Sequence, residues 1–194
     1  PPKARDDLVK ALGDKITVQE GTWNCVNGYG ANQGAKGLPK MKDVRVRQAL
    51  ALAPDRWGGS KYLSKIAIVK TVGGMVFPDS PLAMTKDEML QNPIFNPDNK
   101  ARHAQARKLL KEAGAEGLPI VLWNRAVDQP YKIVGTWLVD QWRKVGFKAT
   151  QAVVPTGIWY AGLRKKKDGD INMSLNCQSV INPLIDVSKW QSSD

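Results

Sequence analysis

The chain has 194 residues, of which 42% are hydrophobic and 24% charged, a composition typical of one globular domain rather than of a disordered chain. Its 29 lysines and arginines against 18 aspartates and glutamates give a formal net charge of +11, so a nucleic-acid-binding function has to be considered. No stretch approaches the roughly 20 apolar residues of a transmembrane helix, and the beginning lacks the apolar core of a secretion signal. The sequence therefore predicts either a cytoplasmic protein or a segment that begins inside a longer chain.

The first hundred residues predict short elements joined by irregular connections. Residues 3–13 have the apolar spacing of a short helix that ends at Gly13, and the alternation in 15–20 predicts a strand. Residues 22–26 predict a second extended piece, and the glycines of 28–42 predict a surface loop. The other elements expected in this part are a helix capped by Asp43 and ended by Pro54, a helix from Asp55 to Ile66, and irregular stretches at 69–81 and 92–97.

From residue 98 onward, helices and strands are expected to alternate. This order predicts an α/β layered domain with a mixed, partly parallel sheet. Ligands of such sheets bind beyond the carboxyl ends of the strands, so the loops 124–130 and 176–183 are the expected functional edge. The elements are a helix at 98–114, a strand at 118–123, a helix at 131–145, a strand at 147–154, a helix at 157–166 and a strand at 170–176.

The residue patterns of the common catalytic and metal sites are missing from the sequence. There is no Gly-x-Ser-x-Gly motif and no phosphate loop that ends in Lys-Ser or Lys-Thr, and Gly28-x-Gly30 lacks the third glycine of a dinucleotide site. Two cysteines and a single histidine, His103, give no metal-ligand spacing, and His103 is expected at the surface on a polar helix face with Arg102. We therefore expect no catalytic residue, metal or cofactor, while a hydrolase that uses carboxylates stays an alternative.

Four segments, in this order along the chain, resemble one protein family. They are DVRVRQALALAPDRW at 43–57, KARHAQARKLLKEAG at 100–114, LVDQWRKVGFKAT at 138–150, and DINMSLN at 170–176 followed by Asn182-Pro183. Together they resemble the family-5 solute-binding proteins of bacterial ABC importers for oligopeptides, dipeptides, nickel and related solutes. Four matches in one order over nearly the whole chain are far more specific than any one of them.

The resemblance implies a ligand-binding module rather than an enzyme. It implies the second lobe of a type II periplasmic binding protein, with a helix and strand entering from the other lobe at 1–21 and an incomplete ligand-binding lobe at 22–194. Such a protein captures a small organic solute, peptide-like or otherwise polar, in a cleft between two lobes that close about a hinge. It delivers the solute to an ABC permease in the inner membrane. We expect a monomer that is periplasmic, or extracytoplasmic and membrane-anchored, and that binds no nucleic acid.

A basic nucleic-acid-binding domain remains the alternative function, because of the net charge of +11 and the seven tryptophans. Binding to DNA that weakens steeply with added salt would distinguish it from a solute-binding lobe.

The resemblance also implies the ligand-binding residues. In dipeptide-binding members, an arginine after the apolar strand pairs with the ligand carboxylate, and an aspartate after the later strand holds its ammonium. The matching positions here hold the neutral residues Gln129 and Ser179, so the site is expected to disfavour zwitterionic dipeptides and to take neutral solutes, or anions reached by Arg125. The alternative is that Arg125 and Asp128 supply the same charges from shifted positions. The expected ligand-binding residues are Trp23, Asn24, Arg125, Asp128, Gln129, Asn176 (where a tryptophan is usual), Gln178 and Ser179.

Cys25 and Cys177 each follow a predicted strand, and within this family both strands are expected to end near the cleft in an oxidising compartment. The sequence leaves open whether the two form a disulfide or stay as two buried thiols.

Overall fold

Four strands make one mixed sheet in the computed structural model, which describes residues 2–19, 25–67, 69, 71–74, 76, 78, 80–164 and 169–177. The strand order is β1-β4-β2-β3. β2 is parallel to β3 and to β4, whereas β1 pairs with β4 in the antiparallel sense. The strands are β1 (Cys25–Ala31), β2 (Pro119–Arg125), β3 (Lys148–Val154) and β4 (Ile171–Cys177). The predicted α/β architecture with a mixed, partly parallel sheet is confirmed.

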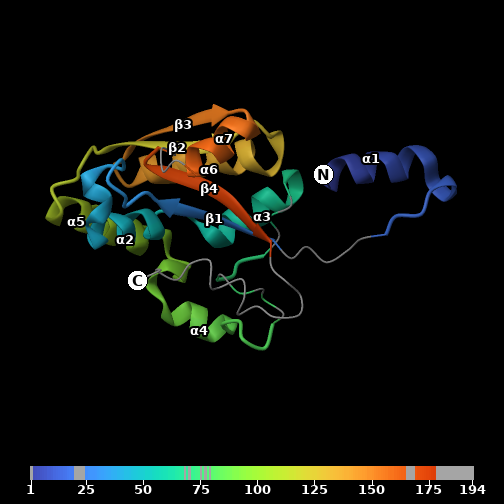
Figure 1. The fold of residues 1–194 in the computed structure, drawn as a ribbon. Coiled ribbons are helices and arrows are strands. Elements are labelled where there is room, and N and C mark those ends of the chain that lie inside the picture. Colours follow the sequence, from blue (N-terminus) through green and yellow to red (C-terminus); the bar gives the residue numbers. More distant parts are fainter. Residues whose placement is uncertain are drawn as a thin grey trace.

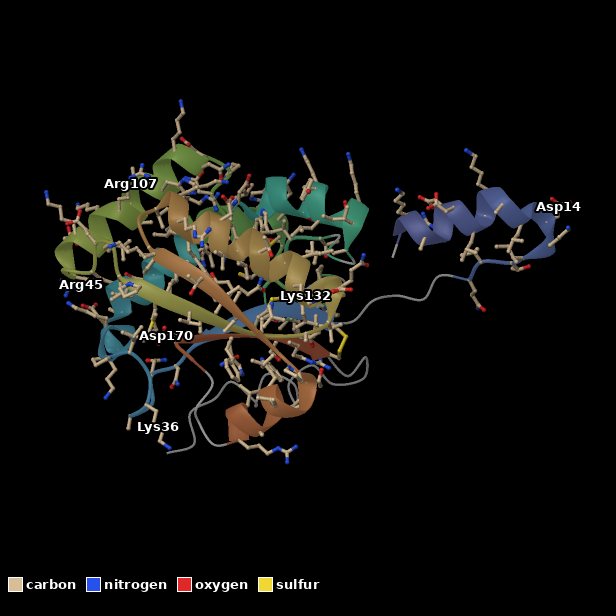
Figure 2. The ribbon with its side chains drawn as sticks, turned by 90° about the horizontal axis from the view of Figure 1, so that it is seen from above. Asp14, Lys36, Arg45, Arg107, Lys132 and Asp170 are labelled. Atoms are coloured by element: carbon tan, nitrogen blue, oxygen red, sulfur yellow. A yellow bond between two sulfur atoms is a disulfide. The ribbon has the colours of Figure 1, made fainter. Side chains whose placement is uncertain are left out.

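Helices cover the two faces of this sheet unequally (Figures 1 and 2). α2 (Val44–Leu52), α3 (Arg56–Ile66), α5 (Asn99–Glu112) and α6 (Ile133–Lys144) form a layer on one face, while α7 (Thr156–Arg164) lies on the other. The short elements are α4 (Lys86–Gln91), the 3-10 turns Gly13–Lys15, Pro39–Lys42 and Pro93–Phe95, and a turn at Asp128–Lys132 that leads into α6.

The main core lies between the sheet and the four-helix layer. Trp142 of α6 is fully buried, and its indole nitrogen donates to the carbonyl oxygen of Leu50 at 3.2 Å. Tyr29 of β1 contacts the Trp142 ring edge-on, with 5.3 Å between ring centroids, and its hydroxyl donates to the same carbonyl at 3.0 Å. The other large side chains buried here include Met41, Leu50, Leu63, Leu110, Ile120, Leu122, Ile171 and Met173. This apolar core fixes the sheet against the helical layer.

The helix ends follow the capping residues expected from the sequence. Asp43, Asp55 and Asp98 accept hydrogen bonds from the first backbone N–H groups of α2, α3 and α5. Gly114 and Gly146, which end α5 and α6, have positive φ angles of 57° and 110°, a region that glycine enters without strain. The helix α4 was not predicted from the sequence. Thr85 and Glu88 form its capping box, and their pattern Thr-x-x-Glu indicates the start of a helix.

Two predictions for the beginning of the chain are wrong. The residues of the predicted strand 15–20 that are described, up to Gln19, form the end of a 3-10 turn and an extended piece without a partner strand. The first part of the predicted loop 28–42 is instead the second half of β1. Glycine has low strand propensity, but the backbones of Gly28 and Gly30 still pair with β4. β1 is the edge strand of the sheet, so it pairs with this one neighbour.

The prediction that Arg102 and His103 lie on an exposed polar face is also wrong. The Arg102 side chain is only 1% exposed; it donates to Pro54 O at 2.6 Å and to Asn99, and lies 3.9 Å from the carboxylate of Asp55. His103 is half-buried with its Nε2 2.9 Å from Ala53 O. Both side chains pair with carbonyl groups at the end of α2, which have no partner within that helix. Burial lowers the pKa of Arg102.

α1 (Pro2–Leu12) projects from the α/β body, with its N-terminal end toward α3, which it contacts (Figure 1). None of its described residues is buried, and the apolar side chains of Leu8, Val9 and Leu12 are exposed. This helix therefore takes no part in the main core. Among the helices of the described residues, none has the length and apolar character needed to cross a membrane.

Candidate functional site

The carboxyl ends of β2, β3 and β4 meet at one edge of the sheet, which we call the carboxyl edge. Because β1 is antiparallel to β4, its first residue lies at the same edge, directly opposite the last residue of β4. These two residues, Cys25 and Cys177, form a disulfide with an S–S distance of 2.02 Å, which closes this end of the sheet (Figure 2). The question that the sequence left open is thus answered in favour of the disulfide, and Cys177 is exposed rather than buried.

A buried asparagine shapes the turn that follows β2. Asn124 is fully buried, and its side-chain nitrogen donates to Tyr131 O and to Gln151 Oε1, both at 2.7 Å. Its side-chain oxygen accepts from the backbone N–H of Arg125 at 2.9 Å. The Gln129–Pro130 peptide is cis, and Gln129 is extended with φ −122° and ψ 134°. After the turn Asp128–Lys132, the helix predicted from residue 131 begins two residues later, at Ile133.

Arg125 is the last residue of β2 rather than part of a loop, and its guanidinium lies among aromatic rings and hydroxyl groups. Its Cζ is 4.6 Å from the ring centroid of Tyr131, 5.4 Å from that of Tyr160 and 5.8 Å from that of Trp159. Its Nη1 donates to the Tyr131 hydroxyl at 2.8 Å, and its Nε and Nη2 both lie 3.4 Å from the Thr156 hydroxyl. We call these five side chains the Arg125 cluster.

Trp159 is the most deeply buried member of the Arg125 cluster. Its side chain is 2% exposed, and its indole N–H has no hydrogen-bond partner among the described residues. Tyr160 packs edge-on against it and remains partly exposed. An unpaired buried donor is costly unless another group satisfies it, so this N–H is a candidate contact for a ligand.

Asp128 and Gln129 differ in how the turn places them. The Asp128 side chain is 83% exposed and forms an ion pair with Lys132, with 2.6 Å between Oδ1 and Nζ. The side-chain oxygen of Gln129 is buried without a hydrogen-bond partner in the part of the chain that the structure describes. Gln129 therefore presents an unused acceptor, whereas the charge of Asp128 is already matched.

Three of the expected ligand-binding residues thus fall at the carboxyl edge: Arg125, Asp128 and Gln129. Asn176 belongs to β4, where its backbone is opposite Val26. Trp23, Asn24, Gln178 and Ser179 lie outside the described residues. Five other residues of this site were not predicted from the sequence: Asn124, Tyr131, Thr156, Trp159 and Tyr160. The rule that ligands bind at carboxyl ends could have indicated Thr156, Trp159 and Tyr160, because α7 begins directly after β3 ends.

The carboxyl edge offers hydrogen-bonding groups and aromatic surface. In the described residues, His, Cys, Asp and Glu side chains nowhere gather in a group of three or more that could hold a metal ion. Gly28 and Gly30, considered above as part of a dinucleotide motif, lie within a strand and not in a turn that opens a helix. The arrangement can bind and orient a polar solute.

Comparisons with known proteins agree on one family. The model for bacterial extracellular solute-binding proteins, family 5 Middle, matches residues 2–194. A search of curated proteins gives no match.

Solved structures with the same fold include three binding proteins. A dipeptide binding protein from Pseudoalteromonas sp. SM9913 in complex with Met-Leu matches with a TM-score of 0.71 and 20% identity, over 97% of this chain and 35% of that chain. The OppA protein of Burkholderia pseudomallei matches with a TM-score of 0.68 and 24% identity, over 90% of this chain and 33% of that chain. The murein tripeptide binding protein MppA of Escherichia coli matches with a TM-score of 0.68 and 18% identity, over 92% of this chain and 33% of that chain. The chain thus spans about a third of the length of these proteins. With the family match over nearly its whole length, the chain belongs to the bacterial extracellular solute-binding proteins of family 5.

Proposed function

We propose that this chain is the second lobe of the substrate-binding component of an ABC importer, which captures a small organic solute between two lobes and delivers it to a permease. The family match supports this proposal, and so do the neighbours, whose names describe peptide-binding proteins. The observation that carries it is the pair of unpaired polar atoms at the carboxyl edge, Gln129 Oε1 and Trp159 Nε1. Such atoms suit a lobe whose site is completed by a ligand and a second lobe.

The α1 helix fits a role at the junction with the other lobe. Its exposed apolar residues Leu8, Val9 and Leu12 find no cover in the α/β body, as expected for a segment that packs against another part of a two-lobe protein. In this proposal residues 1–21 enter from the other lobe, and 22–194 form most of the ligand-binding lobe.

The disulfide supports an extracytoplasmic location. An exposed disulfide such as Cys25–Cys177 persists in an oxidising compartment and is reduced in the bacterial cytoplasm. We propose a monomeric protein that works in the periplasm or is anchored outside the membrane, with the permease as its protein partner. No finding favours the nucleic-acid-binding alternative, and the family and its structural neighbours consist of binding proteins rather than enzymes.

The solute in this proposal is not an ordinary zwitterionic dipeptide. The resemblance to dipeptide-binding members implies that Gln129 takes the position of their carboxylate-binding arginine and Ser179 that of their ammonium-binding aspartate. The alternative, in which Asp128 supplies the negative charge, is weakened by the ion pair of that residue with Lys132 and by its 83% exposure. An exposed, already paired carboxylate adds little to the binding of an ammonium group.

Native mass spectrometry of the intact two-lobe protein tests this function. We expect a small organic solute to be retained through purification and to dissociate on unfolding. The 194-residue chain alone should bind the same solute much more weakly, because half of the enclosing surface is missing. Failure to find any solute that the two-lobe protein binds, or turnover of peptide, ester or glycoside substrates, would argue against a transport role.

A further inference from the structure

Arg125 differs from the other partly or fully buried arginines in its hydrogen-bond partners. Arg47 donates to the carbonyl oxygens of Met41 and Lys42, and Arg56 donates to those of Ala51 and Ile94. Arg102 donates to Pro54 O and lies near the carboxylate of Asp55. Arg125, in contrast, donates only to the hydroxyl groups of Tyr131 and Thr156. No carboxylate of the described residues forms an ion pair with it.

The hydrogen bonds of Arg125 leave donor capacity unused. A guanidinium has five N–H groups, and only the bond to the Tyr131 hydroxyl at 2.8 Å is short. The Nε and Nη2 contacts, both 3.4 Å long, share the single oxygen of Thr156. At least two N–H groups on the terminal nitrogens therefore have no partner within the described residues. The indole N–H of Trp159 in the same cluster is also unpaired.

The aromatic rings of the cluster stabilise a cation without neutralising it. Three ring centroids lie within 6 Å of the Arg125 Cζ, a distance at which the negative face of a ring attracts a cation. They hold the guanidinium in place at the end of β2, half-buried, where its field is screened less than that of a surface arginine. The fork of a guanidinium matches the two oxygens of a carboxylate in a bidentate pair.

We propose that Arg125 is the anchor for a carboxylate group of the solute, so that the transported solute is an organic anion rather than a neutral molecule. The proposal rests on the solute-binding function proposed above and names the chemical class of its ligand. Arg125 takes this role at a position four residues before Gln129. The carboxylate meets the free N–H groups of the guanidinium. Tyr131 and Thr156 act as positioning residues, because they hold the guanidinium through their hydroxyl groups.

A pair of blocked dipeptides tests the proposal in the intact two-lobe protein. N-acetyl-alanyl-alanine carries one carboxylate and no ammonium, and its C-terminal amide is neutral and almost identical in shape. We expect the acid to shift the Arg125 Nε–Hε NMR signal saturably, and the amide and inorganic phosphate to shift it little. The signal is assigned by its loss in the Arg125→Lys variant. An Arg125 signal that does not move with the acid, or that moves equally with the amide or more with phosphate, overturns the proposal.

Variants add a measurement that does not depend on the NMR assignment. In calorimetric titration with N-acetyl-alanyl-alanine, or in competition with it where heats are small, Arg125→Gln should weaken binding about 10- to 100-fold. Arg125→Lys keeps the charge but loses the fork, so it should recover part of this loss. The matched control is Arg164→Gln, which removes an exposed arginine from the last turn of α7 and should leave binding within about 2-fold. Equal losses in the Arg125 and Arg164 variants would mean that net charge alone is responsible.

The two proposals fail in different ways. A retained solute that is neutral, and whose affinity is unchanged in Arg125→Gln, would overturn the carboxylate anchor and leave the transport function standing. A saturable shift of the Arg125 signal by the acid, in a protein for which no transported solute can be found, would uphold the anchor and count against the transport function.

Circular dichroism and the melting temperature of each variant show whether it is folded, and Thr156→Val provides a second test. That variant keeps the guanidinium but removes one of its supports, so it should weaken binding of the acid more than that of the amide.

Discussion

The helical layer and the carboxyl edge of the sheet each hold an arginine away from water, and they treat its charge in opposite ways. In the helical layer, the terminal nitrogens of Arg102 meet two oxygen acceptors and lie near the carboxylate of Asp55, so groups of the fold meet most of its charge, although its Nε has no hydrogen-bond partner among the described residues. At the carboxyl edge, Arg125 meets only hydroxyl groups and ring faces, beside a buried indole N–H without a partner. Matched polar groups serve stability, whereas unmatched ones are available to a ligand.

The two regions also differ in what holds them together. The helical layer rests on packed side chains such as Trp142 and Leu110. At the carboxyl edge the outer strand β1 is bonded covalently to β4, between Cys25 and Cys177. Changes in the helical layer should therefore cost stability and leave ligand preference alone. Substitution of Arg125, which is only half-buried, should have the reverse effect.

The largest expected effect comes from removing the disulfide. It joins residues separated by 152 positions, and in the chain-entropy model such a bond contributes about 4–5 kcal/mol by restricting the unfolded chain. The double variant Cys25→Ser, Cys177→Ser should lose free energy of unfolding of this order, measured by urea denaturation. Thiol titration of the unfolded, unreduced protein should find no free thiol. Two free thiols, or a loss below about 1 kcal/mol, would contradict the assigned role.

Replacing Arg102 should produce the next largest effect. Arg102→Met leaves the buried Pro54 O without its donor and removes the cation beside the partly exposed carboxylate of Asp55, and this loss should cost about 3 kcal/mol. The free energy of unfolding measures it. Arg107→Met, at an exposed position of the same helix, is the matched control and should change stability by less than about 0.5 kcal/mol. If Arg125→Gln destabilised the protein as much as Arg102→Met does, the contrast between the two regions would be lost.

A third substitution tests the support beneath the turn that follows β2. A Cβ added at Gly135 of α6 would collide with the side chains of Gln151 and Asn124, which hydrogen-bond each other there. Gly135→Ala should therefore lower the free energy of unfolding by about 1–3 kcal/mol. Gly157 of α7 has no atom within 4 Å of such a Cβ, so Gly157→Ala should be neutral or stabilising, by up to about 1 kcal/mol. Equal effects of the two substitutions would show that the collision at Gly135 is relieved at no cost.

Local signals in the sequence were sufficient for much of the fold. Aspartates before α2, α3 and α5 and glycines after α5 and α6 act through the nearest backbone groups, so their meaning can be read without the tertiary structure. Features that depend on distant partners could not be predicted in this way. β1 forms in spite of its glycines because β4, more than 140 residues later, pairs with it. The burial of Arg102 depends on where α2 ends, and the aromatic surroundings of Arg125 depend on how α7 lies against the sheet.

The smallest effect on stability is expected for a substitution at the amino ends of the strands. There, Oδ2 of Asp170 accepts a hydrogen bond from the backbone N–H of Val121 at 2.8 Å, one residue before β4 begins, so a side chain takes the place of a strand partner. Burial raises the pKa of Asp170 above its ordinary value of 3.8, against the opposing effect of this hydrogen bond.

A group whose pKa is raised by folding contributes stability at pH values below its unfolded pKa, and this contribution is lost as the pH rises through the folded pKa. The amide of Asp170→Asn keeps the acceptor and cannot ionise. Near neutral pH the variant should therefore be as stable as the wild type or slightly more stable, by less than about 1 kcal/mol, and this advantage should vanish as the pH falls below about 4. Free energies of unfolding at pH 3.5, 5 and 7 measure the trend. If the stability of the variant relative to the wild type increased with falling pH, the ionised carboxylate would be the form that the fold stabilises. The hydrogen bond from Val121 would then outweigh burial.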